Sequence, residues 1–159
     1  MRLLRENRPE LFWSAMGTAG RMRLPEAVPL IQQNVPWDDS DMAYRGADAL
    51  AEIDTPEARA LLRRMLRAPR PLTRMEVAKA MLSEHATWAH KALTSLLDDR
   101  GVIRYAHGSA EVRDEIADEF HLAIYDGPRV DTSAPRATRD RQIAAMKRYL
   151  EKHPLALKR

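Results

Sequence analysis

The stretch Thr55-Pro56-Glu57-Ala58-Arg59-Ala60-Leu61-Leu62 occurs in three related forms, each 31 residues from the next. The first is Leu24-Pro25-Glu26-Ala27-Val28-Pro29-Leu30-Ile31, and the looser third is Ala86-Thr87-Trp88-Ala89-His90-Lys91-Ala92-Leu93. A repeat of this length with helical periodicity is typical of stacked helical hairpins, which bury their apolar faces against one another. The repeat therefore predicts an all-α fold, an α-solenoid of about four stacked antiparallel hairpins.

The middle repeat carries clear signals for a helix. Thr55 is suited to cap the helix, and Pro56 is tolerated in its first turn. Apolar residues then recur at helical spacing, at Ala58, Leu61, Leu62, Met65 and Leu66. The equivalent residues of the other two repeats are Ala27, Leu30, Ile31, Asn34 and Val35, then Ala89, Ala92, Leu93, Leu96 and Leu97. These positions predict a buried face, in which only Asn34 is polar, at a helix end where it can cap carbonyl groups.

A further helix is predicted before each of these, over residues 10–20, 40–53 and 73–84. The period stops after Asp98, and the apolar stretch 102–105 is not assigned to an element. Helices are predicted again over 109–125 and 137–152. We therefore expect a single repeat domain over residues 1–159, with regular repeats at about 10–98 and a divergent C-terminal capping unit at about 102–152.

Composition narrows the class of protein. Hydrophobic residues make up 45% and charged residues 31% of the chain, values of an ordinary globular protein. Apolar runs are too short to span a membrane, and the charged residues 1–9 do not resemble a signal peptide. The absence of cysteine excludes disulfides, thiolate metal ligands and cysteine nucleophiles. A cytoplasmic location is expected, although cysteine-free periplasmic proteins also exist.

The repeats resemble HEAT-like repeats, particularly the short bacterial type. One repeat matches that pattern at Arg45, Ala49, Leu50, Asp54, Pro56, Glu57, Ala58 and Leu61, and another matches it at Pro25, Glu26, Ala27, Val28, Pro29 and Leu30. The resemblance implies stacked helical hairpins and roles such as scaffolding and partner recognition. DNA-repair glycosylases and bilin lyases also use such repeats, but the repeat motif itself carries no catalytic residue.

The candidate binding residues follow from this resemblance, because the second helices of a HEAT-like stack line its concave surface. On the middle helix, the positions left outside the core include Arg59, Arg63, Arg64 and Arg67, and the spacing of four between Arg59, Arg63 and Arg67 predicts one ridge. His90 and Lys91 occupy the same face of the next repeat, and Trp37 in an inter-repeat loop is a candidate interface anchor. This arginine-rich face predicts an acidic protein partner.

Other interpretations of these residues remain open. Each arginine is also compatible with a solvated helix face paired with Asp54 or Glu57, and Trp37 with packing over a repeat junction. A phosphate backbone is an alternative partner, but the net charge is only +3 and the flanking Gln32, Thr94 and Ser95 are neutral.

Catalytic and metal signatures are weak in this sequence. One helix carries Glu115, Asp118, Glu119 and His121, but no second motif supplies matching ligands. The five histidines show no spacing that marks a catalytic triad. We therefore expect a non-enzymatic protein-binding module or adaptor with no cofactor and no metal. The alternative is a nucleic-acid-binding HEAT-like protein, related to the DNA-repair glycosylases.

Overall fold

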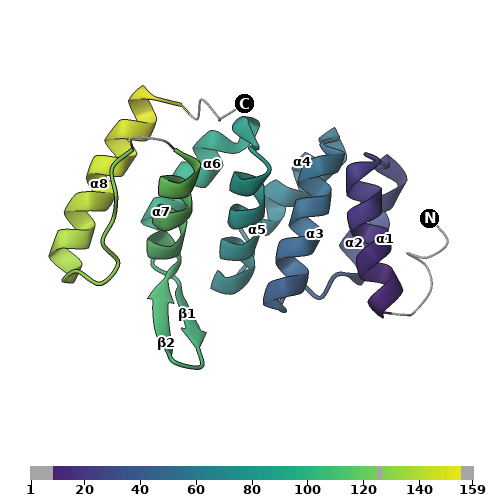
Figure 1. The fold of residues 1–159 in the computed structure, drawn as a ribbon, viewed down its shortest axis with the longest axis horizontal. Coiled ribbons are helices and arrows are strands. Elements are labelled where there is room, and N and C mark those ends of the chain that lie inside the picture. The colour runs from purple at the N-terminus through teal and green to yellow at the C-terminus, as the bar shows by residue number, and fades with distance from the viewer. Residues whose placement is uncertain (1–8, 125–126, 155–159) are drawn as a thin grey trace. The chain divides into compact units, whose positions relative to one another are not determined.

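The fold is that of a computed structural model, which describes residues 9–124 and 127–154. The chain is mostly helical, with one small two-stranded sheet, so the prediction of a predominantly helical class is confirmed (Figure 1). It divides into two compact units, Met1–Glu84 and His85–Arg159. The charged residues 1–8 used in the localisation argument lie outside the described part.

The first unit consists of two layers of helices. Its elements are α1 (Pro9–Arg21), the 3-10 turn η1 (Pro25–Ala27) leading into α2 (Val28–Asn34), α3 (Ser40–Ile53), α4 (Pro56–Met65) and α5 (Pro71–Ser83). Helix α3 packs between α1 and α5, while α4 contacts α2, α3 and α5 (Figure 1). Helices α1, α3 and α5 therefore form one layer, and α2 and α4 the other.

The second unit combines helices with a β-hairpin. Its elements are η2 (Thr87–Ala89) leading into α6 (His90–Ser95), η3 (Leu96–Asp98), β1 (Val102–Tyr105), β2 (Gly108–Glu111), α7 (Val112–Ala123) and α8 (Arg136–Lys152). Strands β1 and β2 pair antiparallel, with Tyr105 opposite Gly108 at the tip. Helix α7 follows β2 directly and packs against η3.

The 31-residue period of the sequence is also a period of the backbone. Helices α1, α3 and α5 begin at residues 9, 40 and 71, while η1, α4 and η2 begin at 25, 56 and 87. Among the described non-glycine residues, positive φ occurs at Arg23 (51°), Asp54 (53°) and His85 (57°), which are also 31 residues apart. This left-handed conformation costs roughly 1–2 kcal/mol for a non-glycine residue. Its threefold recurrence indicates that the same turn is imposed in each repeat.

The predicted caps at Thr55 and Asn34 and most of the predicted core positions are confirmed. Thr55 Oγ1 accepts a hydrogen bond from the Ala58 amide at 3.2 Å, and Asn34 Nδ2 donates to the Leu30 carbonyl at 2.8 Å. Most of the predicted core positions are buried, namely Ala27, Ile31, Val35, Ala58, Leu61, Leu62, Leu66, Ala89, Leu93, Leu96 and Leu97. Leu30, Met65 and Ala92 are half-buried instead.

The prediction for residues 109–125 was wrong at its beginning. Ser109, Ala110 and Glu111 form a strand, and the helix begins only at Val112. The reason is that this segment pairs with 102–105, the apolar stretch that the sequence left unassigned. Helix α7 ends at Ala123, and the predicted terminal residue Tyr125 lies outside the described part.

Helix length and polarity also bear on membrane insertion. Within residues 9–124 and 127–154, every helix is too short or too polar to cross a bilayer.

Two glycines of α1 give a test of its packing on α3. A Cβ at Gly20 would clash with the Glu52 Oε2 atom and would lie 3.0 Å from the Ala49 Cα, whereas the nearest neighbour of a Cβ at Gly17 would be the Arg21 Nη1 at 3.6 Å. We predict that Gly20→Ala lowers the free energy of unfolding by about 1–2 kcal/mol, because the α3 backbone must move. Gly17→Ala, the matched control, should raise it by about 0.5–1 kcal/mol through helix propensity. Chemical denaturation measures both, and an equal gain for the two variants would contradict the close approach.

Candidate functional site

The arginine cluster, defined as Arg59, Arg63, Arg64 and Arg67, lies on α4 and the turn that follows it. Ala58, Leu61 and Leu62 are buried on one side of α4, which directs the arginines to the other side. Arg63, Arg64 and Arg67 are exposed and Arg59 is half-exposed. The local sequence therefore places a group of guanidinium side chains on the solvent side of α4.

Arg59 differs from the rest of the cluster because it is bound to Asp54 through two hydrogen bonds. Its Nε and Nη2 donate to the two carboxylate oxygens, both at 2.8 Å. These hydrogen bonds raise the pKa of the Arg59 guanidinium above its ordinary value. The sequence had left open a pairing of this kind, and it means that the charge of Arg59 is matched within its own repeat.

Arg67 does not continue the helical ridge predicted from the spacing of four residues. Helix α4 ends at Met65, and the Arg67 amide donates to the Arg64 carbonyl in a tight turn at 3.0 Å. Pro69 follows and disfavours a helical conformation at Ala68, so the helix cannot extend. Arg67 therefore extends the cluster beyond the end of α4 and not along its side.

Two neighbouring arginines stabilise the loop after the cluster. Arg74 Nη1 donates to the Ala68 carbonyl at 2.7 Å and to the Pro69 carbonyl at 3.0 Å, and Arg70 pairs with Asp38 at 3.1 Å. The side chains of Arg64 and Arg67, by contrast, make no hydrogen bond or ion pair with any described residue. These two guanidinium groups are the part of the cluster best placed to meet a partner.

The other predicted contact residues lie elsewhere. Trp37 is half-buried, and a Cβ at Gly46 of α3 would lie 3.3 Å from its Cη2 atom. The Trp37 carbonyl also accepts from Thr73 Oγ1 of α5 at 2.6 Å, so this loop is held against two helices. His90 is half-exposed and Lys91 is exposed, both on α6 of the second unit.

The structure reveals an ionic cluster in the second unit that sequence reasoning missed. Arg113 is buried, with its side chain 4% exposed, and lies 2.6 Å from both Glu111 and Asp140. Asp114 is 3% exposed and pairs with Arg139 of α8. Burial raises the pKa of Asp114, whereas the hydrogen bond from Arg113 lowers the pKa of Asp140.

The ion pairs of this cluster connect α8 to other elements of its unit. Further ion pairs join Arg100 to Asp140 at 3.5 Å, Arg136 to Glu111 at 3.7 Å and Lys147 to Asp98 at 2.6 Å. Because each arginine is paired with at least one carboxylate of the same unit, the cluster is better suited to hold structure than to bind a charged ligand. The helical periodicity of the sequence could have revealed this cluster. Arg113 falls on the apolar stripe of α7, with Ile116 and Phe120, and Arg139 falls on that of α8, with Ile143, Met146 and Leu150.

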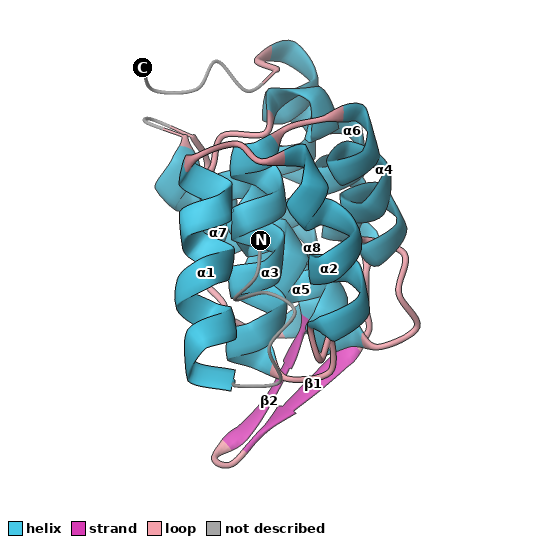
Figure 2. Cartoon of the chain, turned by 90° about the vertical axis from the view of Figure 1, so that its right-hand side faces the viewer, coloured by secondary structure: helices cyan, strands magenta, loops and turns pink. Residues whose placement is uncertain are grey.

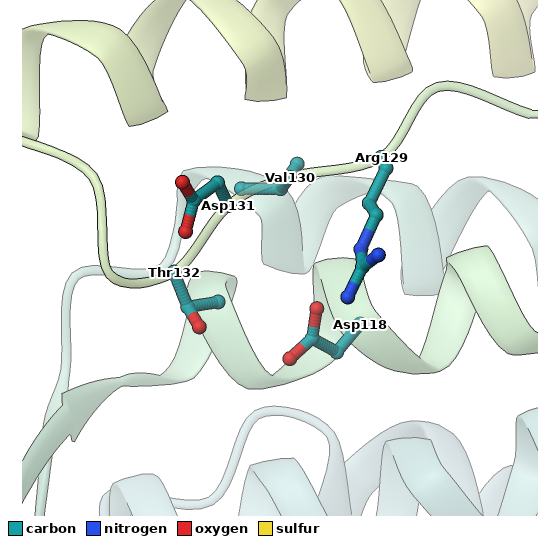
Figure 3. Close-up of a pocket in the computed structure, with 5 residues that line it drawn as sticks. All are labelled: Asp118, Arg129, Val130, Asp131 and Thr132. Atoms are coloured by element: carbon teal, nitrogen blue, oxygen red, sulfur yellow. The ribbon is translucent and has the colours of Figure 1, made fainter.

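A pocket of about 360 Å³ lies between α7 and the loop before α8. It is lined by Asp118, Arg129, Val130, Asp131 and Thr132, and the Arg129 guanidinium points toward the Asp118 carboxylate (Figure 3). The Asp131 carboxylate is engaged by the hydroxyl and amide of Ser133, which lowers its pKa. Asp118 belongs to the acidic group Glu115, Asp118, Glu119 and His121. Within the described ranges, no three His, Asp or Glu side chains are arranged to hold a metal ion.

The carboxyl group of Asp48, on α3, has a strongly raised pKa. Burial, and then repulsion from Glu84 and Glu52, raise its pKa to about 6, against an opposing effect of Arg45. Burial and Glu84 likewise raise the pKa of Glu52. A raised carboxyl pKa is common in general acids and bases, but burial together with the neighbouring carboxylates Glu84 and Glu52 accounts for it here without a reaction.

The raised pKa of Asp48 predicts that its contribution to the free energy of unfolding depends on pH. Its pKa is about 6 in the folded protein and about 3.8 when unfolded, so the folded state binds the proton more tightly. The contribution of the Asp48 carboxyl group to the free energy of unfolding is therefore greatest below about pH 4 and is lost as pH rises through 6. We predict that Asp48→Asn stabilises the protein at pH 7 by about 1 kcal/mol, allowing for solvent screening, and has little effect at pH 4.

The control for Asp48→Asn is Asp41→Asn in the same helix. Asp41 is an exposed first-turn residue paired with Arg45 at 2.8 Å. Removing its charge should slightly destabilise the protein at pH 7, because a favourable helix-terminal charge is lost. Thermal denaturation at both pH values measures the two variants, and a destabilising effect of Asp48→Asn at pH 7 would contradict a cost of ionising this buried carboxyl group beside Glu84 and Glu52.

No family model, curated protein or solved structure matches this chain. The backbone period, the charges and the exposed side chains are therefore the features that indicate a function for this protein.

Proposed function

We propose that this protein is a non-enzymatic HEAT-like α-solenoid module that binds an acidic protein partner through the arginine cluster. The recurrence of helix starts and left-handed turns every 31 residues supports the HEAT-like assignment. The observation that carries the binding proposal is the exposed pair Arg64 and Arg67, which have no carboxylate partner among the described residues. In a HEAT-like stack, α4 would belong to the concave surface.

The mechanism is recognition by a preorganised surface. The cap at Thr55 fixes the start of α4, and the hydrogen bonds from Arg74 fix the loop that follows Arg67. A guanidinium group can pair with a carboxylate through two parallel hydrogen bonds, which gives directional as well as electrostatic selectivity. Since the backbone around the arginines is already ordered, binding requires little further loss of conformational entropy. His90, Lys91 and Trp37 are proposed as additional contacts.

An acidic protein fits this surface better than a nucleic acid does. Exposed carboxylates interrupt the positive charge, with Asp54 beside Arg59 and Asp38 beside Arg70. A phosphate backbone favours a continuous cationic track, because every neutralised phosphate contributes to affinity. Separate carboxylates of a protein partner can instead meet the individual guanidinium groups of Arg64 and Arg67.

The test compares an acidic peptide with DNA as probes. We predict that a fluorescein-labelled Glu/Asp-rich peptide binds the protein, with an affinity that falls as salt is raised. Arg64→Glu/Arg67→Glu should weaken this binding about tenfold or more, since two attractive contacts become repulsive. Arg59 and Arg63 stay unchanged, which leaves the Asp54 pair intact. Fluorescence anisotropy measures the affinities.

The matched control is Arg141→Glu/Arg148→Glu, which makes the same change in net charge on exposed positions of α8. Its affinity for the peptide should remain close to that of the unmodified protein. Equal losses in both double variants would show that net charge alone drives binding, which contradicts the proposed site. Preferential binding of a short DNA duplex, lost in Arg64→Glu/Arg67→Glu, would favour the nucleic-acid alternative instead.

A further inference from the structure

The β-hairpin of the second unit has strand edges that pair with no further strand among the described residues. The sheet has two strands, so the outer edge of β1 and the outer edge of β2 are both unpaired within the described ranges. Val102 is 54% exposed and Tyr105 is 45% exposed, both on β1. In Figures 1 and 2 the hairpin extends beyond the N-terminal end of α7, with its tip away from that helix. Unpaired strand edges are templates for pairing with another chain.

The base of the hairpin is firmly held even though its tip projects. Ile103 is 3% exposed, and the Val112 amide donates to the Gly101 carbonyl at 2.9 Å. The Asp99 carboxylate accepts from the Gly101 amide at 2.8 Å. An isolated two-stranded ribbon is only marginally stable, so these contacts at the base keep β1 in register.

The charge of the ribbon identifies the kind of partner. The segment from Arg100 to Ala110 contains no Asp or Glu, and Arg100 is paired with Asp140. Arg104 is exposed, and its side chain has no hydrogen bond or ion pair with the described residues. Because side chains alternate along a strand, Arg104 shares its face with Val102. This edge therefore offers a cation and an apolar side chain two residues apart.

The two edges are not equivalent. Strand β2 carries Gly108, Ser109 and Ala110, whose small side chains offer little for recognition, and Glu111 is taken up by the ionic cluster. A second copy of β1 would bring no carboxylate to pair with Arg104, because the segment from Arg100 to Ala110 contains no Asp or Glu. The edge of β1 is consequently suited to a foreign strand that carries negative charge.

We propose that β1 is the docking edge for an extended acidic segment of a protein partner, which adds to the hairpin as a third strand. A carboxylate of that segment lies beside Arg104, and a β-branched apolar residue lies beside Val102. Backbone hydrogen bonds along β1 supply affinity, and the two side chains supply selectivity. This surface is independent of the arginine cluster, so either can fail without the other.

The test uses three short peptides and the full chain labelled with ¹⁵N. The first peptide carries Glu and Val two residues apart, so that both side chains lie on one face of a strand. The second has Lys in place of Glu, and the third carries N-methyl groups on every central backbone amide of the first. Titration with the first should shift the amide resonances of residues 102–105 most strongly. The Lys peptide should bind at least about tenfold more weakly, and the N-methylated peptide should not bind, because it cannot form the strand ladder.

Variants of the protein locate the site. Arg104→Glu should reverse the preference between the Glu and Lys peptides, whereas Arg129→Glu, an exposed arginine of the same unit, should leave it unchanged. Circular dichroism confirms that each variant is folded.

Three results would overturn the proposal. They are equal binding of the N-methylated peptide, resonance shifts centred on α4 or β2, and an unaltered preference in Arg104→Glu. Shifts centred on α4 would also show that the peptide uses the arginine cluster, which separates the two proposals.

Discussion

The left-handed turn that recurs at Arg23, Asp54 and His85 is the constraint on which the rest of the first three repeats depends. Each of these residues lies two positions before the next helical segment, at Pro25, Pro56 or Thr87. The turn therefore sets where the second helix of each repeat begins and which of its faces meets the core. None of the three residues is glycine, so packing around the turn must outweigh an intrinsic cost of roughly 1–2 kcal/mol at each.

This constraint explains why the arginines of α4 face solvent. With the start of α4 fixed at Pro56, the helical period directs Ala58, Leu61 and Leu62 inward and leaves the remaining positions outside. The same turn places Asp54 where its carboxylate holds Arg59 in a defined position. One backbone conformation thus orients the helix and orders the first guanidinium group of the cluster.

The arginine cluster of the first unit and Arg113 of the second unit lie in opposite environments. On α4 the guanidinium groups are exposed, whereas Arg113 lies inside the second unit among carboxylates. The difference follows from position on the helix, because Arg113 falls on the apolar stripe and Arg64 does not. A buried arginine requires matched carboxylates to offset its desolvation, and Glu111 and Asp140 provide them.

The helices of the repeats could be predicted because their signals are local. Thr55 and Pro56 mark a helix start, and apolar residues at helical spacing mark its buried face. The β-hairpin could not be predicted from the sequence, because Ser109 and Ala110 have little strand preference and become a strand only by pairing with residues 103–104. Arg113 was missed because the apolar stripe was read from apolar residues alone, while Arg67 was misplaced because the effect of Pro69 on the helix end was overlooked.

The most direct measurement is the backbone φ angle of Arg23, Asp54 and His85 in solution, from NMR three-bond couplings and chemical shifts. A fold built on one repeated turn predicts positive φ at all three residues, near the values of 51°, 53° and 57°. A negative φ at any of the three would break the 31-residue period of the backbone. It would contradict the claim that a shared turn orients the helices and, with them, the arginine cluster.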